Sequence, residues 1–89
     1  MTSRTTQRFR ELFEDLPAEI QRQAREAYGI FRDNPLHPGL RFRLVHATRP
    51  IYSARINQSY RSVGIRTEDI IVWFWIGSHA EYDRLLDRL

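Results

Sequence analysis

The segment Ile70–Ile76 constrains the fold of this chain more than any other part of its 89 residues. Its seven residues, Ile-Ile-Val-Trp-Phe-Trp-Ile, are all apolar. β-branched and aromatic side chains favour strands, and neighbouring side chains of a strand point to opposite faces. We therefore expect a central strand that is covered on both sides. The run is far shorter than the roughly 20 apolar residues of a membrane helix, so no membrane association is expected.

Three earlier segments show the two-residue period of strands. They are Leu40–Val45, Ile51–Ile56 and Tyr60–Ile65, and short polar loops join them as in an antiparallel meander. In the first of them, alternation places Arg41 and Arg43 together on one face.

Helical periodicity brackets these strands. Apolar residues recur at helical spacing over Thr6–Asp15, and again from Pro17 to Asp33, where Asn34-Pro35 ends the pattern. A third apolar stripe lies near the end of the chain, and Ser78 and Glu81 form a capping box at its start. Residues 1–89 are thus expected to form a single α+β domain. An N-terminal helical hairpin would pack on a four-stranded antiparallel sheet, with a short C-terminal helix on the other side.

Composition limits the compartment and the chemistry. The chain has no cysteine, which excludes a disulfide framework and a thiolate metal site. The three histidines lie on separate elements without ligand spacing, so neither a metal nor another cofactor is expected. Residues 1–10 are polar and basic, unlike a secretory signal. These features predict a cytoplasmic protein.

Charge is distributed unevenly along the chain. Residues 34–67 contain six arginines and no Asp or Glu, whereas residues 68–89 contain two arginines and five acids. A carboxylate-free basic region of this length favours a polyanionic partner, although a basic solvated surface would have the same composition.

The order of elements and several short motifs resemble the RelE/ParE toxin superfamily over essentially the whole chain. The motifs are Leu16-Pro17, Asn34-Pro35, Ile51-Tyr52-Ser53-Ala54-Arg55-Ile56, Tyr60-Arg61 and Trp75-Ile76-Gly77-Ser78-His79. The resemblance implies the toxin of a type II toxin–antitoxin system, held in check by a cognate antitoxin. In the RelE-like and HigB-like branch, members cleave mRNA without a metal, generally on the ribosome. In the ParE-like branch, members inhibit DNA gyrase and lack the ribonuclease residues.

The resemblance also implies site residues. Arg55 and Arg61 match basic residues on the sheet face of the ribonuclease branch, and His79 matches a position that is basic there. Ser53 stands where some members carry a second basic residue. Leu85 stands where a tyrosine is usual, and Tyr82 would have to replace it from one helical turn earlier.

The chemistry of metal-free RNA cleavage suits these residue types. The ribose 2′-hydroxyl attacks the adjacent phosphorus, which requires a base, cations around the phosphorane and an acid for the departing 5′-oxygen. Arg55 and Arg61 would hold the phosphate, and His79 is the best candidate for the base. Tyr82 would orient the site or donate the proton, or it would simply pack in the core.

Further RNA contacts are expected from the basic region, namely Arg41, Arg43, His46 and Arg49. Three readings remain open: a ribosome-dependent endoribonuclease acting on mRNA, an inhibitor of DNA gyrase that uses the same basic face, and an inactive member of the superfamily.

Overall fold

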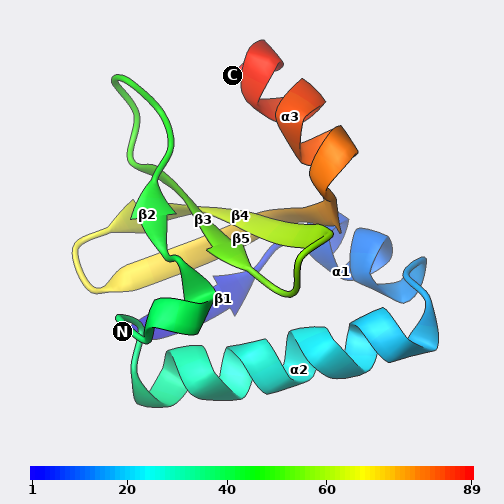
Figure 1. Ribbon diagram of the computed structural model, residues 1–89. Coiled ribbons are helices and arrows are strands. Elements are labelled where there is room, and N and C mark those ends of the chain that lie inside the picture. The colour runs from blue at the N-terminus through cyan, green and yellow to red at the C-terminus, as the bar shows by residue number, and fades with distance from the viewer.

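The computed structural model describes residues 1–89 and confirms an α+β fold with three helices (Figure 1). The helices are α1 (Gln7–Glu14), α2 (Ala18–Asp33) and α3 (His79–Arg88). The strands are β1 (Thr2–Thr5), β2 (Arg43–Leu44), β3 (Ile51–Arg55), β4 (Tyr60–Thr67) and β5 (Ile70–Ser78). None of the three helices has the length and apolar character needed to cross a membrane.

The sheet has five strands in the order β1-β5-β4-β3-β2, so the expectation of four antiparallel strands is wrong at one edge. β1 runs parallel to β5, with Thr2 opposite Ile70 and Thr5 opposite Trp73. The indole N–H of Trp73 also donates to Ser3 Oγ at 3.4 Å. The segment Thr2–Thr5 has no apolar alternation. It joins the edge of the sheet through its backbone, and its side chains are mostly exposed.

The strand expected over Leu40–Val45 is also largely wrong. Pro38–Leu40 forms a 3₁₀ turn, η1, and Arg41 follows it with a φ of 46°. A residue in this left-handed region cannot continue a strand. Only Arg43 and Leu44 therefore form the strand β2, and the N–H of Val45 next to it donates to the Ile51 carbonyl of β3.

The doubly apolar strand is covered on both faces, as expected. α2 runs along one face of the sheet and α3 stands on the other (Figure 1). On the hairpin side, Ile71 and Trp73 pack with Phe31 of α2, whose ring meets Trp73 edge-on at 5.4 Å. On the α3 side, Val63 packs with Tyr82, and Trp75 lies against them.

A β-bulge adjusts how β5 fills these two cores. Val63 is opposite Trp75 and Gly64 is opposite Trp73, so Phe74 has no direct partner on β4. The extra residue lets both Phe74 and Trp75 pack on the α3 side. The two tryptophans thus belong to the cores, as the apolar character of the strand predicts.

The capping box expected at the start of α3 is present. Ser78 Oγ accepts from the N–H of Glu81, and the Glu81 carboxylate accepts from the Ser78 backbone and hydroxyl. These bonds hold the pKa of Glu81 below its usual value. The cap fixes where the chain leaves β5 and turns into α3, which positions His79.

Candidate functional site

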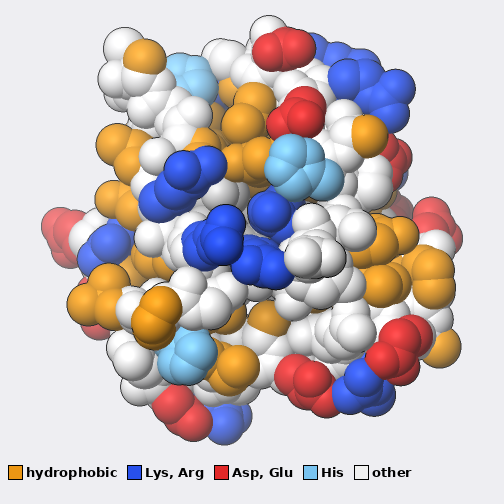
Figure 2. All heavy atoms as spheres, in the orientation of Figure 1, with side chains coloured by type: hydrophobic (Ala, Val, Ile, Leu, Met, Phe, Trp, Pro, Cys, Tyr) orange, Lys and Arg blue, Asp and Glu red, His pale blue; other side chains and the backbone are white.

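The pairing of β3 with β4 brings two of the expected site residues together. Arg55 lies directly opposite Arg61, and Arg43 of β2 lies opposite Ser53, two residues earlier on β3. Since residues two apart on a strand share a face, all three arginines project from the face that carries α3. Figure 2 shows arginine side chains gathered near the centre of this view, with a histidine at their upper edge.

The guanidinium of Arg61 is held by the turn between β3 and β4. Its Nη1 donates to the backbone carbonyls of Asn57 at 2.6 Å and Tyr60 at 2.9 Å. The Asn57 side chain shapes this turn, since its Oδ1 accepts from the N–H of Ser59 and of Tyr60. Its Nδ2 donates to Gln23 on α2 at 2.5 Å. Asn57 was missed in the sequence, where it stands only as a polar residue of a strand-connecting loop.

The charges of the site are mutually unfavourable. Partial burial lowers the pKa of Arg61, and the positive charges of Arg55, Arg41 and Arg43 lower it further. No carboxylate is among the groups that influence it. Like charges held close together repel one another, and this repulsion lowers the stability of the fold. A bound polyanion reduces the repulsion. We call Arg41, Arg43, Arg55 and Arg61 the arginine cluster.

Tyr82 reaches this region from α3 and is almost completely buried. Its hydroxyl donates to Ser53 Oγ at 3.2 Å, and Ser53 itself is only 3% exposed. Ser53 thus supplies a small buried hydroxyl that accepts from Tyr82. Sequence reasoning described this position only by what it lacks, because the partner is 29 residues away.

His79 lies at the first position of α3 and is about half exposed. Its Nδ1 is 3.3 Å from Asp83 Oδ2, and its ring meets the Tyr82 ring edge-on at 5.7 Å. Nδ1 faces the Asp83 carboxylate, which leaves Nε2 as the ring nitrogen open to a ligand. Asp83 and Tyr82 thus orient the imidazole from two sides.

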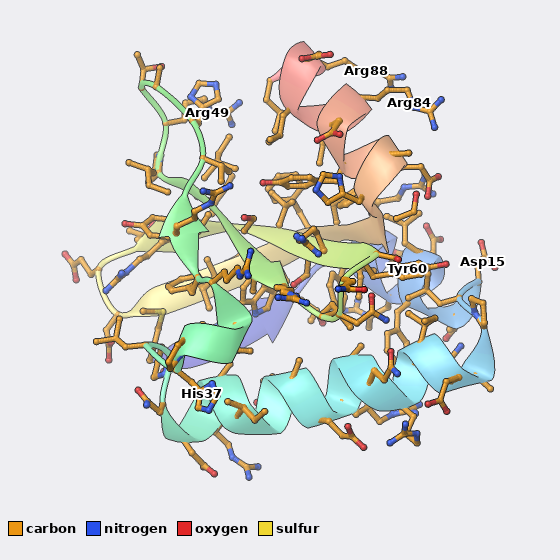
Figure 3. The ribbon with its side chains drawn as sticks, viewed as in Figure 1. Asp15, His37, Arg49, Tyr60, Arg84 and Arg88 are labelled. Carbon is orange, nitrogen blue, oxygen red and sulfur yellow. The ribbon has the colours of Figure 1, made fainter.

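The remaining expected RNA contacts are dispersed. His46 is engaged within the fold: Nδ1 accepts from the N–H groups of Thr48 and Arg49, and Nε2 lies 2.8 Å from the carbonyl oxygen of Leu89. It ties the β2–β3 loop to the end of α3. Arg49 lies at the tip of that loop, away from the sheet surface that carries the arginine cluster (Figure 3).

The structure contains no group of three or more His, Cys, Asp or Glu side chains that could hold a metal ion. The site consists of the cationic surface of the arginine cluster and the His79 imidazole.

Comparison with known families identifies the family of the chain. The model of the ParE-like toxin domain matches residues 18–84, three quarters of the chain. The chain belongs to this toxin family. The match includes α2, the four antiparallel strands and most of α3, and therefore all of the site residues described above. No curated protein sequence matches the chain.

Solved structures of low sequence identity share the fold of this ParE-like toxin. YafQ from Escherichia coli BL21(DE3) matches with a TM-score of 0.72 at 9% identity, covering 90% of this chain and 94% of YafQ. The RelB–RelE antitoxin–toxin complex from Methanococcus jannaschii gives 0.73 at 14% identity, with 91% and 96% covered. The toxin–antitoxin complex RelBE2 from Mycobacterium tuberculosis gives 0.70 at 22% identity, with 88% and 96% covered.

Proposed function

We propose that this ParE-like toxin is the toxin of a type II toxin–antitoxin system and a metal-independent endoribonuclease that cleaves mRNA on the ribosome in the cytoplasm. The observation that carries the proposal is the Arg55–Arg61 pair on the α3 face of the sheet, with His79 at its edge. Two guanidinium groups on paired residues, of which that of Arg61 is held by backbone carbonyls, offer the bidentate contacts that phosphate oxygens favour.

In the proposed reaction, Nε2 of His79 accepts the proton of the ribose 2′-hydroxyl. The 2′-oxygen then attacks the adjacent phosphorus, and the bond to the 5′-oxygen breaks as that oxygen takes a proton from water. The His79 imidazolium gives its proton to the resulting hydroxide, and a 2′,3′-cyclic phosphate and a 5′-hydroxyl are the products. Arg55 and Arg61 stabilise the additional negative charge of the phosphorane. The turn carbonyls that hold Arg61 direct it to one place despite the repulsion of its neighbours.

Tyr82 is assigned a positioning role. Its ring supports His79, and its hydroxyl, which the sequence suggested as a proton donor, already donates to Ser53. Arg41 and Arg43 extend the cationic surface for flanking phosphates. His46 and Arg49 lie in the β2–β3 loop. They would contact only RNA that extends past this loop.

The proposed protein partner is an antitoxin with an acidic segment. Residues 34–67, which supply the arginine cluster, contain no carboxylate, so an acidic chain laid on the cluster would relieve its repulsion and block the phosphate site. The structures from M. jannaschii and M. tuberculosis are toxin–antitoxin complexes, which supports a partner of this kind.

The test compares wild-type protein, Arg61→Ala and His79→Ala. Each is expressed in bacteria without an antitoxin, and mRNA is analysed by primer extension. We expect growth arrest and discrete new 5′ ends with the wild type. Loss of a transition-state donor costs about 10²–10³ in rate, so Arg61→Ala should abolish both. His79→Ala should reduce cleavage less than Arg61→Ala does, because water can accept the proton of the 2′-hydroxyl in place of the imidazole.

Inhibition of DNA gyrase is the second candidate. It is favoured by Ser53, which leaves β3 with one cation of the two that some ribonucleases of the superfamily carry. A supercoiling assay with purified gyrase is run beside the primer extension. Intact transcripts together with blocked supercoiling would contradict the ribonuclease proposal and support inhibition of gyrase.

A further inference from the structure

A pocket of about 310 Å³ lies between α2, the η1 turn and the end of β3. One part of its wall is apolar and includes Ile30, Leu40 and Ile56. Ile30 is 40% exposed. The volume lies at the lower end of the range of small-ligand sites, and the pocket wall is of mixed polar and apolar character.

The pocket adjoins the phosphate-binding surface. Arg55 belongs both to the arginine cluster and to the pocket wall. His37, another wall residue, is on the near side of the molecule in Figure 3, below the sheet and beside α2. A nucleotide whose phosphate rests on Arg55 therefore has the pocket within reach of its base.

Two polar groups of the wall have hydrogen-bonding capacity that the fold does not use. His37 Nδ1 accepts from the N–H of Gly39 at 3.1 Å, so the neutral ring carries its proton on Nε2, which has no partner. Glu26 accepts from Arg22 through Oε1 alone, and Oε2 is unpaired. Glu19, by contrast, binds Arg22 through both carboxylate oxygens.

We infer that this pocket binds a nucleobase of single-stranded RNA that carries an exocyclic amino group. The inference rests on the proposed function. Unpaired bases are recognised through apolar or aromatic contact with their faces and hydrogen bonds to their edges. The apolar wall provides the contact surface. Glu26 Oε2 accepts from the amino group, and His37 Nε2 donates to the neighbouring ring nitrogen.

Cytosine and uracil allow a direct test of the role of the amino group, because uracil has a carbonyl oxygen where cytosine has its amino group. A carboxylate opposite that carbonyl is repulsive. A hydrogen bond to a charged group is worth enough to change affinity by about tenfold or more, so we expect at least that preference for cytidine over uridine.

The experiment titrates ¹⁵N-labelled protein with cytidine 5′-monophosphate and with uridine 5′-monophosphate and follows amide signals by NMR. We expect shifts of the Gly39 N–H and of the Asn57 side-chain amide, at about tenfold lower concentration of the cytidine nucleotide. Glu26→Gln should bring the two affinities close together, because an amide also donates to the uracil carbonyl. Equal affinities in the wild type, or shifts that avoid both groups, would overturn the inference.

Glu19→Gln is the control. Glu19 pairs with Arg22 like Glu26 and is similarly exposed, but it lies outside the pocket. It should leave the nucleotide preference unchanged, and an equal loss with both variants would contradict a role for the pocket. If the wild type cleaves no mRNA yet binds cytidine nucleotide here, the ribonuclease proposal fails and the pocket stands. If the wild type cleaves mRNA but the titration shows no preference for cytidine, the inference about the pocket is overturned and the ribonuclease proposal is not.

Discussion

Replacing Tyr82 by phenylalanine removes one oxygen atom from the core beneath α3 and leaves the aromatic ring in place. The lost hydrogen bond leaves Ser53 Oγ buried without a partner. A buried polar group without a partner costs about 1–3 kcal/mol, so we expect Tyr82→Phe to lower the free energy of unfolding by about that amount. Ser53→Ala leaves the Tyr82 hydroxyl unpaired and should cost about the same.

The double variant distinguishes a real bond from two separate defects. With both partners apolar, neither is left unsatisfied, and such a replacement is close to neutral. Urea denaturation of the wild type, both single variants and the double variant should give a coupling energy of at least about 1 kcal/mol. Independent sites are additive within about 0.5 kcal/mol, and additivity here would refute the bond and the account of Ser53 built on it.

The same four proteins separate the two roles considered for Tyr82. A positioning role acts through the bond to Ser53, so both single variants should slow mRNA cleavage to a similar extent. A proton donor acts through the tyrosine hydroxyl alone. Unimpaired cleavage by Ser53→Ala, with loss in Tyr82→Phe, would contradict the positioning role and restore the donor.

Three further changes test the fold by chemical denaturation. Trp73→Ala should lower the free energy of unfolding by about 3–5 kcal/mol, because this side chain is 6% exposed, and a loss below 1 kcal/mol would contradict its place in the core. Gly64→Ala should cost about 1–3 kcal/mol, since a Cβ there would lie 2.9 Å from the Val72 carbonyl oxygen, which belongs to a paired strand and cannot easily move. The lowered pKa of Glu81 means that its stabilising contribution is present above the usual value of 4.5 and is lost as the pH falls through the lowered one. Ser78→Ala should remove that part of the acid dependence and cost about 1 kcal/mol at neutral pH, whereas an unchanged acid transition would show that the cap is not formed.

The elements with strong periodicity were predictable from the sequence. The apolar stripes of α1, α2 and α3 and the apolar run of β5 each reflect burial against a neighbour, and burial leaves a pattern in residue types. β1 leaves none, because Thr2–Thr5 are held by backbone hydrogen bonds to a strand far along the chain. The left-handed conformation of Arg41 likewise has no signal in the residue type, since arginine rarely adopts it.

The site was predictable in part for a related reason. Arg55 and Arg61 stand at the end and start of adjacent strands, and a short turn places such residues opposite each other. The partners that orient the site come from other elements: Ser53 meets Tyr82 across the sheet, and Asn57 meets Gln23 of α2. His46 looked like an RNA contact because it lies in a basic loop, but its ring bonds within the fold are visible only in three dimensions.

The parallel pairing of β1 with β5 has a consequence for how the chain folds. Thr2 meets Ile70, so the sheet closes only after nearly the whole chain has come together. Contacts between residues far apart in sequence slow folding, because the intervening chain loses its freedom before the contact contributes. On the ribosome, the residues of β1 emerge before those of β5 and cannot pair until β5 has been synthesised. A nascent chain or fragment that lacks either partner exposes an unpaired strand edge, and such edges recruit strands from other molecules.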